Sequence, residues 1–454
     1  MKRGSLFAGS GWRRGAPPAH WIVAGPRASR RSHRQSARAS VVVATTLVLL
    51  GTVAPRPARA ELVYELDPSI SVGATDNALG SPIGQVQSRD GFGRAGLAAR
   101  ARYRGLRSAH ALALQLARTQ FINDGAADSS SADLGLASTM NLTPNLSLTL
   151  GASAVLSRTT GVTLLVSPDV ATPQGMLAVP LTYFSTGVTQ ALDYTATPRL
   201  AYAETLVFAQ LRYLTDAIAI PTATALTGRL KGGLSFTRDT FSLEGVLTDS
   251  YVPGTASAFG ATGVFAHGNV FLASLLAGWR RELSMRWSTE LQGGALAIFT
   301  LDGHSLIAPS GRAALEFRRM PWFTTLVVSQ TPASNLFLGQ VTVSDQALVR
   351  LALPLDIHEL MVLSGVGGYT YARVADAEGR LVRGYDQWSA GASFAARLAR
   401  LPLTGALEYS LAYQGGNTGS GGTIPSLVRQ TVMLTVSGTF LFGPGTPPLF
   451  SGVR

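Results

Sequence analysis

The chain has 454 residues, of which 46% are hydrophobic and 14% charged, and it contains no cysteine. This length allows one large barrel or two to three ordinary domains, and the lack of cysteine excludes disulfides, thiol catalysis and thiolate metal sites. Residues 1–60 hold 11 of the 38 Lys and Arg residues and no acid, which leaves 27 basic and 26 acidic residues after them, so the net charge of +12 does not indicate a nucleic-acid-binding protein.

The first 60 residues have the layout of a secretory leader. A basic region with five arginines between residues 27 and 38 precedes an apolar run at residues 41–53. Ala58-Arg59-Ala60 then matches a small-residue cleavage site, so we expect cleavage after Ala60. The apolar run is shorter than the roughly 18–20 residues of a membrane helix. We therefore expect residues 1–60 to be a signal peptide, with an N-terminal helical anchor as the alternative.

From residue 61 onward, segments of about 10–14 residues alternate apolar and polar side chains, as expected of strands with one face in each environment. A long irregular insertion is expected at residues 158–179, and a short Pro- and Gly-containing tail at 443–454. The eighteen predicted strands, in chain order, are 65–75, 92–104, 108–121, 132–142, 146–156, 182–195, 200–211, 223–236, 241–251, 270–280, 283–299, 307–318, 322–330, 341–353, 359–373, 387–397, 402–414 and 427–442.

The last strand shows the pattern most clearly. Val432, Leu434 and Val436 share one face with Phe440 and Phe442, while Thr and Ser dominate the other face. Its length suffices for the about 9–11 residues that a tilted strand needs to cross a bilayer. A soluble sandwich would carry many charges on its polar face, whereas Lys231 is the single lysine after residue 60.

The links between the predicted strands alternate between short and long. Short turns such as Thr143-Pro144-Asn145 and Thr197-Pro198-Arg199 are typical of periplasmic turns, and longer Gly- and Ser-rich links such as residues 415–425 are typical of extracellular loops. The sequence therefore predicts an all-β fold with one domain at residues 61–454. This domain is a single transmembrane antiparallel β-barrel of about 18 strands (16–18), located in the outer membrane of a Gram-negative cell.

Charged side chains on the polar faces are candidates for the lining of the barrel lumen. They could select a solute or polymer, or they could pair with one another and hold the wall, because buried charges need partners. Parity along the strands selects Arg94, Arg100, Arg102, Arg229, Lys231, Arg286, Glu290, Arg312, Glu316, Arg350 and Glu408.

Aromatic residues could form a sugar path, but their parity places them on the outward faces. This is typical of interface girdles. The eight residues concerned are Tyr103, Tyr251, Trp279, Trp287, Tyr369, Tyr371, Tyr409 and Tyr413.

Catalysis has little support in the sequence. The histidines after residue 60 are His110, His267, His304 and His358, each in or near a predicted loop or turn, and there is no G-x-S-x-G motif. We therefore expect no enzyme, no cofactor and no metal site.

The start of the barrel region, Asp67-Pro68-Ser69-Ile70-Ser71-Val72-Gly73-Ala74-Thr75-Asp76-Asn77, resembles the first strand of outer-membrane barrel families found with exopolysaccharide gene clusters. The Arg-rich second strand is also similar to theirs. The resemblance implies a porin that passes secreted polysaccharide and works with a periplasmic polysaccharide co-polymerase or export protein.

The combined hypothesis is a passive conduit in the lipid bilayer, with an exported or capsular polysaccharide in its lumen. A general porin or a porin for solute uptake, with a small solute in the lumen, is the first alternative. An adhesion or structural barrel and a barrel-embedded lipid-modifying enzyme are minor ones.

Overall fold

The computed structural model describes residues 61–442, apart from residues 80, 82, 168–169, 215–221, 253–267, 301–302, 320–321, 336–339, 356–359, 376–380, 399–400 and 416–425. The expected leader with its cleavage site at Ala60 and the tail at residues 443–454 lie outside the described residues. Within them, no helix has the length and apolar character needed to span a membrane.

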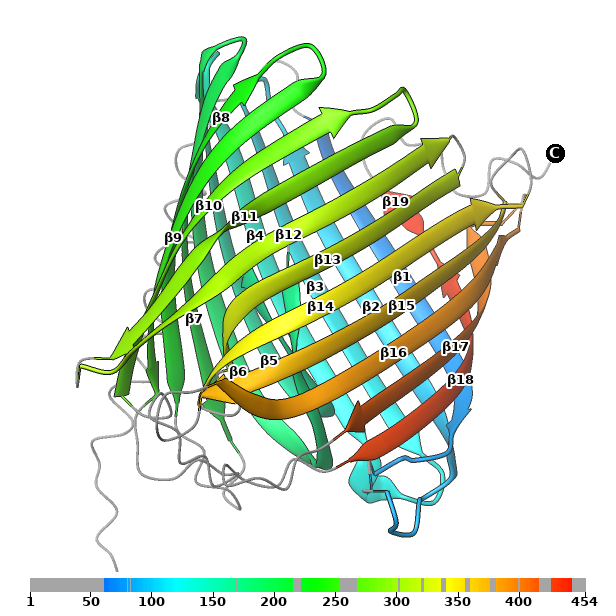
Figure 1. Ribbon diagram of the computed structural model, residues 1–454. Coiled ribbons are helices and arrows are strands. Elements are labelled where there is room, and N and C mark those ends of the chain that lie inside the picture. Colours follow the sequence, from blue (N-terminus) through cyan, green and yellow to red (C-terminus); the bar gives the residue numbers. More distant parts are fainter. Residues whose placement is uncertain are drawn as a thin grey trace, which may run out of the picture. The chain divides into compact units, whose positions relative to one another are not determined.

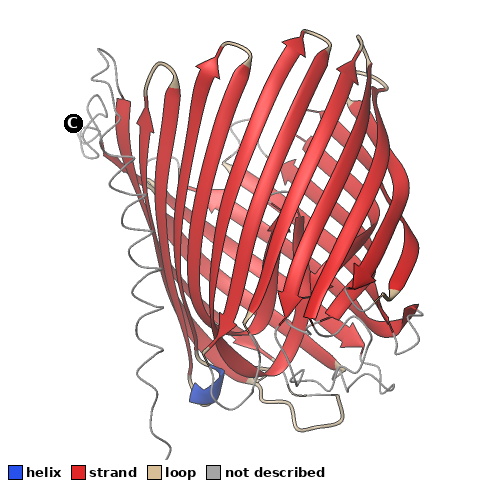
Figure 2. Cartoon of the chain, turned by 90° about the vertical axis from the view of Figure 1, so that its left-hand side faces the viewer, coloured by secondary structure: helices blue, strands red, loops and turns tan. Residues whose placement is uncertain are grey.

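Strands make up almost the entire described chain, with one short 3-10 turn, η1 (Gly125–Ala127), between the third and fourth strands (Figure 2). The strands are β1 (Glu61–Thr75), β2 (Asp90–Arg104), β3 (Ser108–Phe121), β4 (Ser129–Thr143), β5 (Leu146–Ser167), β6 (Val170–Thr197), β7 (Leu200–Tyr213), β8 (Ala223–Ser235), β9 (Asp239–Val252), β10 (Gly268–Glu282), β11 (Trp287–Thr300), β12 (Ser305–Arg319), β13 (Trp322–Asn335), β14 (Gln340–Pro354), β15 (Met361–Ala375), β16 (Leu381–Arg397), β17 (Leu403–Gly415), β18 (Leu427–Gly438) and β19 (Phe440–Phe442).

The sheet closes on itself. From β1 to β18, each strand pairs antiparallel with its neighbours in sequence, and β1 also pairs with β18 and β19 (Figure 1). Ser69 opposes Ser437 and Glu65 opposes Leu441, so β18 and β19 continue in one register against β1. They form a single spanning strand, interrupted at the level of Pro68, which has no N–H to donate. The structure is therefore a closed antiparallel barrel of 18 spanning strands, which confirms the predicted fold and strand number.

Several predicted boundaries are wrong. The strand predicted at 387–397 begins at Leu381, and the strand predicted at 322–330 extends to Asn335. Residues 158–179 were expected to be irregular, but β5 and β6 continue through most of them as a longer hairpin with several register shifts. Such irregularities break the two-residue period from which strands are recognised. The strand predicted at 283–299 begins instead at Trp287, after a turn that includes Arg286.

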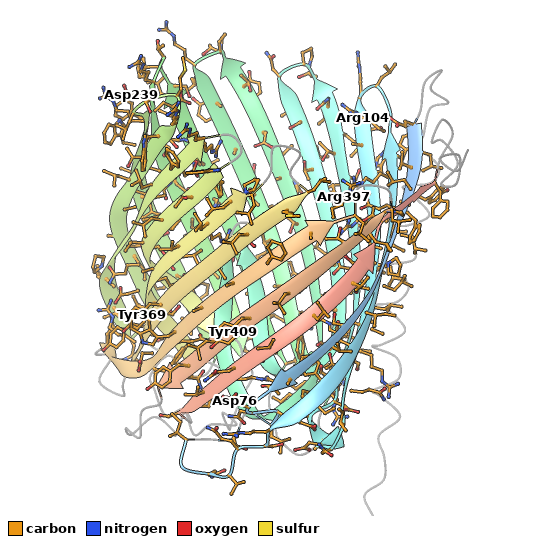
Figure 3. All side chains as sticks on the ribbon, turned by 90° about the vertical axis from the view of Figure 1, so that its right-hand side faces the viewer. Asp76, Arg104, Asp239, Tyr369, Arg397 and Tyr409 are labelled. Carbon is orange, nitrogen blue, oxygen red and sulfur yellow. The ribbon has the colours of Figure 1, made fainter. Side chains whose placement is uncertain are left out.

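The two ends of the barrel differ in their connections. Figure 3 places Arg104 and Arg397 toward one end and Asp76 and Tyr369 toward the other. At the first end the links are short, as at residues 105–107, and both Glu61 and Phe442 lie there; at the second end the links are long, as between β1 and β2. Short turns mark the periplasmic end and long loops the extracellular end of outer-membrane barrels.

The inner face of the wall is identified by contacts between strands that are not neighbours. Arg280 on β10 lies 4.0 Å from Glu316 on β12, and β11 lies between these two strands in the sheet. Side chains on the convex face diverge, so such contacts require the concave face. Residues directly opposite one another in the register share a face, which assigns the other strands in turn.

The outer face is apolar and exposed. Leu243, Leu247, Leu275, Ile307 and Leu434 each have between 51% and 77% of their surface exposed.

Aromatic residues edge this apolar band. The ring pair Trp287–Phe317 lies near the end with short turns, and the pair Tyr369–Trp388 lies near the end with long loops. An apolar band between two aromatic girdles matches a surface in contact with lipid.

Candidate functional site

Ten of the eleven charged residues selected from the sequence lie in strands, and the register aligns them with the inner face. Across β11 to β14, for example, Ser288, Glu316, Thr325 and Arg350 follow one another as opposed residues. Arg286 is the exception, because it lies exposed in the turn before β11. Its assignment to the lumen was wrong because the apolar alternation of Leu283, Met285 and Trp287 continues through that turn.

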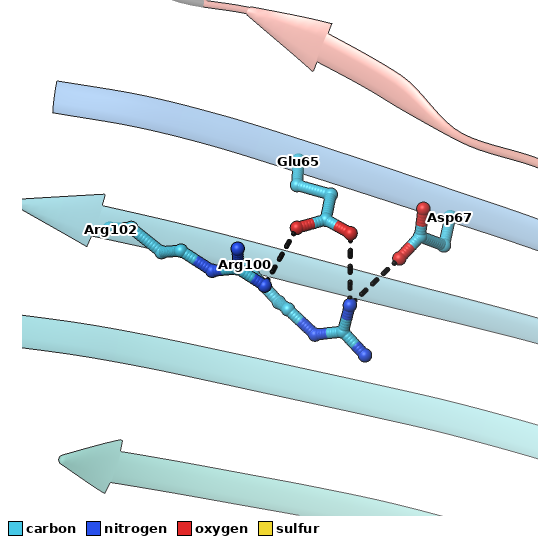
Figure 4. A network of polar contacts seen from close by, with 4 residues as sticks. All are labelled: Glu65, Asp67, Arg100 and Arg102. Carbon is cyan, nitrogen blue, oxygen red and sulfur yellow. Dashed lines mark hydrogen bonds and ion pairs between the residues drawn. The ribbon is translucent and has the colours of Figure 1, made fainter. Parts of the chain in front are cut away.

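The first charged cluster joins β1 to β2 (Figure 4). Arg100 Nη1 lies 2.9 Å from Glu65 Oε1 and 3.2 Å from Asp67 Oδ2, and Arg102 Nη2 lies 3.1 Å from Glu65 Oε2. The Arg102 side chain remains 59% exposed, whereas that of Glu65 is 15% exposed. The cluster therefore holds its carboxylates against the wall and presents guanidinium groups to the lumen.

A small-residue wall lies beside this cluster. Arg100 opposes Ala113 and Arg102 opposes Ala111 on β3, and the next strands continue this inner face with Gly135 on β4. Alanine and glycine leave space in front of the two guanidinium groups. The inner face of β3 and β4 is therefore formed by small side chains at the level of Arg100 and Arg102.

The second cluster joins β8 to β9. Glu244 Oε1 lies 3.2 Å from Arg229 Nε, and Glu244 Oε2 lies 4.0 Å from Lys231 Nζ. Its side chain is only 9% exposed, while that of Lys231 is 41% exposed. One buried carboxylate thus serves two cations, and the cluster leaves a net positive charge on the wall.

The third cluster spans β10 to β12. Glu316 is 2.7 Å from Arg318 Nη2 and 4.0 Å from Arg280 Nη2, and Ser288 Oγ donates to it at 3.4 Å. On the neighbouring level Gln292 Nε2 donates to Glu290 at 3.0 Å. Here too the cations are more exposed than the carboxylate that they share.

Four of the selected residues have no partner within the described part of the chain. Arg94 and Arg350 are exposed on the inner face, and Arg312 and Glu408 are partly exposed there. Pairing therefore accounts for Arg100, Arg102, Arg229, Lys231 and Glu316, but not for these four. Their side chains are available to a solute.

The extracellular end of the inner wall is covered. One inward-facing residue from nearly every strand is at most 8% exposed there: Thr75, Phe92, Ser157, Tyr183, Tyr213, Ala223, Ser250, Val270, Thr300, Ala308, Ser344, Ala372, Tyr385, Gln414 and Leu427. Side chains that face an open lumen would be exposed to water, so the lumen is narrowed at this end.

Part of this cover comes from the end of the β13–β14 hairpin. The pairing of β12 with β13 stops at Gly311 and Gln330, whereas β13 and β14 stay paired to Asn335 and Gln340. Beyond Gly311 and Gln330 the hairpin is no longer paired with β12, although β14 stays paired with β15 as far as Thr342. Val343 is fully buried there with Leu296, Ile298 and other inner residues of β10 to β12. Leu381, at the start of β16, packs on the same cluster.

The β1–β2 loop covers another part of the wall. Asn77 Nδ2 donates to the carbonyl oxygens of Ser81 and Val428, and Arg429 Nη2 donates to that of Ala78. Asn77 and Ala78 are fully buried. These bonds hold the loop against the extracellular end of β18.

Sequence reasoning missed several inward-facing charges, among them Glu65, Glu244, Arg280 and Arg318. Parity within their own strands would have selected Glu244 with the same rule that selected Arg229. The rule does not show which charges face each other, because that depends on the register between strands.

The histidines form no shared site. His110 Nδ1 lies 2.8 Å from Ser138 Oγ near the short-turn end, His304 lies in the link between β11 and β12, and His267 and His358 lie outside the described residues. Among the residues that the structure describes, no group of three or more metal-ligating side chains comes together.

No family model matches the sequence, and no curated protein matches it. Solved structures with a similar fold include OpdO of Pseudomonas aeruginosa (12% identity, TM-score 0.46, covering 85% of this chain and 98% of that one) and OccK2 (OpdF) of the same organism in complex with glucuronate (11%, 0.45, 85% and 99%). OccAB3 of Acinetobacter baumannii is similar at 10% identity and a TM-score of 0.44, covering 85% of this chain and all of that one.

Because these sequence identities and TM-scores are low, the membrane location of the barrel is assigned from its own geometry. A closed sheet satisfies its backbone groups within lipid, its outer face is an apolar band with aromatic edges, and its inner face is polar and charged. The protein is an integral β-barrel of the outer membrane.

Proposed function

We propose that the protein is a passive channel for small polar solutes. The observation that carries this proposal is the contrast along the inner wall: exposed charged side chains line it toward the periplasm, and its extracellular end is covered. Barrels of about 16–18 strands are wide enough to leave an aqueous channel. A narrowed entrance above an open, charged vestibule fits the passage of small molecules.

The export of a secreted or capsular polysaccharide, which the first strand suggests by resemblance, receives less support. A polymer chain needs an outlet that stays open over its full length, whereas β14 and β16 fold side chains over the extracellular end. A periplasmic polysaccharide co-polymerase or export protein remains a partner only of that second hypothesis. The proposed passage of small solutes requires no catalytic residue.

Conductance in planar bilayers, combined with swelling of proteoliposomes in sugars, amino acids and organic acids of increasing size, tests the proposal. We expect discrete conductance steps and a sharp size limit, with no block by neutral or acidic polysaccharide. A correctly folded barrel that conducts no ions would contradict a channel function. Block of the steps by polysaccharide would instead favour the export hypothesis.

A further inference from the structure

Three arginines lie on the outer surface near the extracellular end of the alternate strands β3, β5 and β7. Arg118 on β3 opposes Ser130 on β4, which in turn opposes Arg158 on β5, so these side chains share the outward face. Arg212 on β7 opposes the outward-facing Phe184 of β6. All three arginines are exposed.

Their spacing follows from the register. Arg118 and Arg158 lie in one row two strands apart, which corresponds to about 10 Å. Arg212 lies two further strands along the wall and about two residues off that row. The three guanidinium groups therefore span roughly 20 Å along the rim of the barrel.

No acid neutralises these arginines within the described part of the chain. Arg118 and Arg212 have no partner there, and Arg158 donates one hydrogen bond, from Nη2 to the carbonyl oxygen of Ala126. In contrast, Arg373, which faces outward on β15, is paired with Asp345 at 3.2 Å. A guanidinium group has five N–H donors, so each of the three arginines keeps most of its donors free.

The same rim is acidic elsewhere. Asp249 on β9 shares the outward face with Leu247, and Asp386 on β16 shares it with Trp388. Among the described side chains, the arginines of this rim that no acid neutralises lie on β3 through β7, which argues for a specific anionic partner rather than a general attraction to the membrane surface.

Exposed apolar side chains lie directly below the arginines. Leu116 precedes Arg118 by two residues on the same face and is 41% exposed, and Leu156 has the same relation to Arg158 and is 46% exposed. Phe208, below Arg212, is 41% exposed. The surface thus offers cations at the level of lipid headgroups and hydrocarbon contacts at the level of acyl chains.

We propose that this outer surface of β3 to β7 binds the phosphorylated headgroup of a glycolipid in the outer leaflet. Arg118, Arg158 and Arg212 hold the phosphate oxygens, since guanidinium groups bind phosphate through paired N–H donors. Leu116, Leu156 and Phe208 contact the acyl chains. Arg158 also joins the lipid to the loop that contains η1.

Binding of bisphosphorylated lipid A to the purified, full-length protein in non-ionic detergent tests this site. The triple variant with Arg118→Ala, Arg158→Ala and Arg212→Ala is compared with a double variant, Arg281→Ala and Arg319→Ala, which removes outward-facing arginines at the periplasmic end. Heat-modifiable migration in gels verifies that each barrel is folded. We expect the triple variant to bind at least about tenfold more weakly and the double variant to bind like the wild type.

Two competitors separate the lipid from a free anion. Dephosphorylated lipid A is expected to bind the wild type weakly, with an affinity like that of bisphosphorylated lipid A for the triple variant. Equimolar inorganic phosphate is expected not to displace bisphosphorylated lipid A from the wild type. The proposal is overturned if the folded triple variant binds as the wild type does, or if the periplasmic double variant loses as much binding. It is also overturned if dephosphorylated lipid A binds equally well or inorganic phosphate displaces the lipid.

Discussion

The two halves of the inner wall differ in chemistry and in exposure. Toward the periplasm, Arg102, Lys231 and Arg318 have side chains that are 41% to 63% exposed. Toward the cell exterior, Leu296 and Ile298 face inward yet are 1% exposed. One closed sheet thus carries both a charged vestibule toward the periplasm and a narrow throat toward the cell exterior. The apolar cluster around Val343 forms part of the wall of this throat.

The largest effect is expected from opening the throat with Val343→Asp. Burying an unpaired carboxylate at the fully buried position of Val343 would cost about 2 kcal/mol or more. The end of the β13–β14 hairpin should therefore separate from β10 to β12. Without an apolar constriction, the single-channel conductance should rise about twofold or more. The control is Val366→Asp, because Val366 faces inward, is 44% exposed and keeps a new carboxylate hydrated. Equal conductance in the two variants would contradict a throat formed by this hairpin.

The next effect concerns the buried carboxylate of the vestibule. Glu244→Gln removes the negative charge that Arg229 and Lys231 share. These two cations, about 7 Å apart on β8, then have no anion between them. We expect a loss of about 1–2 kcal/mol in the free energy of unfolding, measured by urea titration in micelles. Glu408 also carries a carboxylate on the inner face, but it has no partner among the described residues. Glu408→Gln should therefore leave the free energy of unfolding unchanged. If both variants unfold alike, the β8–β9 cluster does not hold the wall.

A smaller difference separates wall-holding arginines from solute-facing ones. Arg100→Met deprives Glu65 and Asp67 of their shared cation, and with Arg100 about a third exposed we expect a loss of about 1 kcal/mol after solvent screening. Arg350→Met should leave stability unchanged, because Arg350 has no described partner. Reversal potentials in a salt gradient should shift toward cation selectivity in both variants. A shift in neither variant would argue against a role of the vestibule charges in permeation.

The smallest effect is expected on the outer wall. Glu204 faces outward on β7 between Tyr202 and Leu206, near the periplasmic interface. Glu204→Leu should stabilise the barrel in bilayers by at most about 1 kcal/mol, because charges near the interface cost little. Its conductance should equal that of the wild type, and any change would mean that the difference between the two halves is not confined to the inner wall.

The strands and their faces were predictable because the two-residue period depends only on neighbours in sequence. Val432, Leu434 and Val436 alternate with Thr and Ser, and they face outward in the structure as expected. The period fails in the long β5–β6 hairpin, where register shifts interrupt it, and it misleads at Arg286, where an apolar alternation runs through a turn.

The throat could not be predicted in this way. It depends on contacts of Val343 and Leu381 with β10 to β12, and these strands are not neighbours of β14 or β16 in the sheet. Likewise, the sharing of Glu244 by Arg229 and Lys231 depends on the register between β8 and β9. Sequence alone selects the charges, whereas the closed wall decides which of them meet.

The seam between the first and last strands has a consequence for assembly. Every other pairing joins strands that follow one another in the chain, but Ser71 and Thr435, which meet across the seam, are 364 residues apart. Hairpins can form in sequence at low entropic loss, whereas the seam requires the closure of the longest possible loop. Closure must therefore be the final step, and until β18 arrives both edges of the sheet offer unpaired backbone groups to the membrane. A chaperone or insertion machine that recognises the last strand would control whether the whole barrel completes or aggregates.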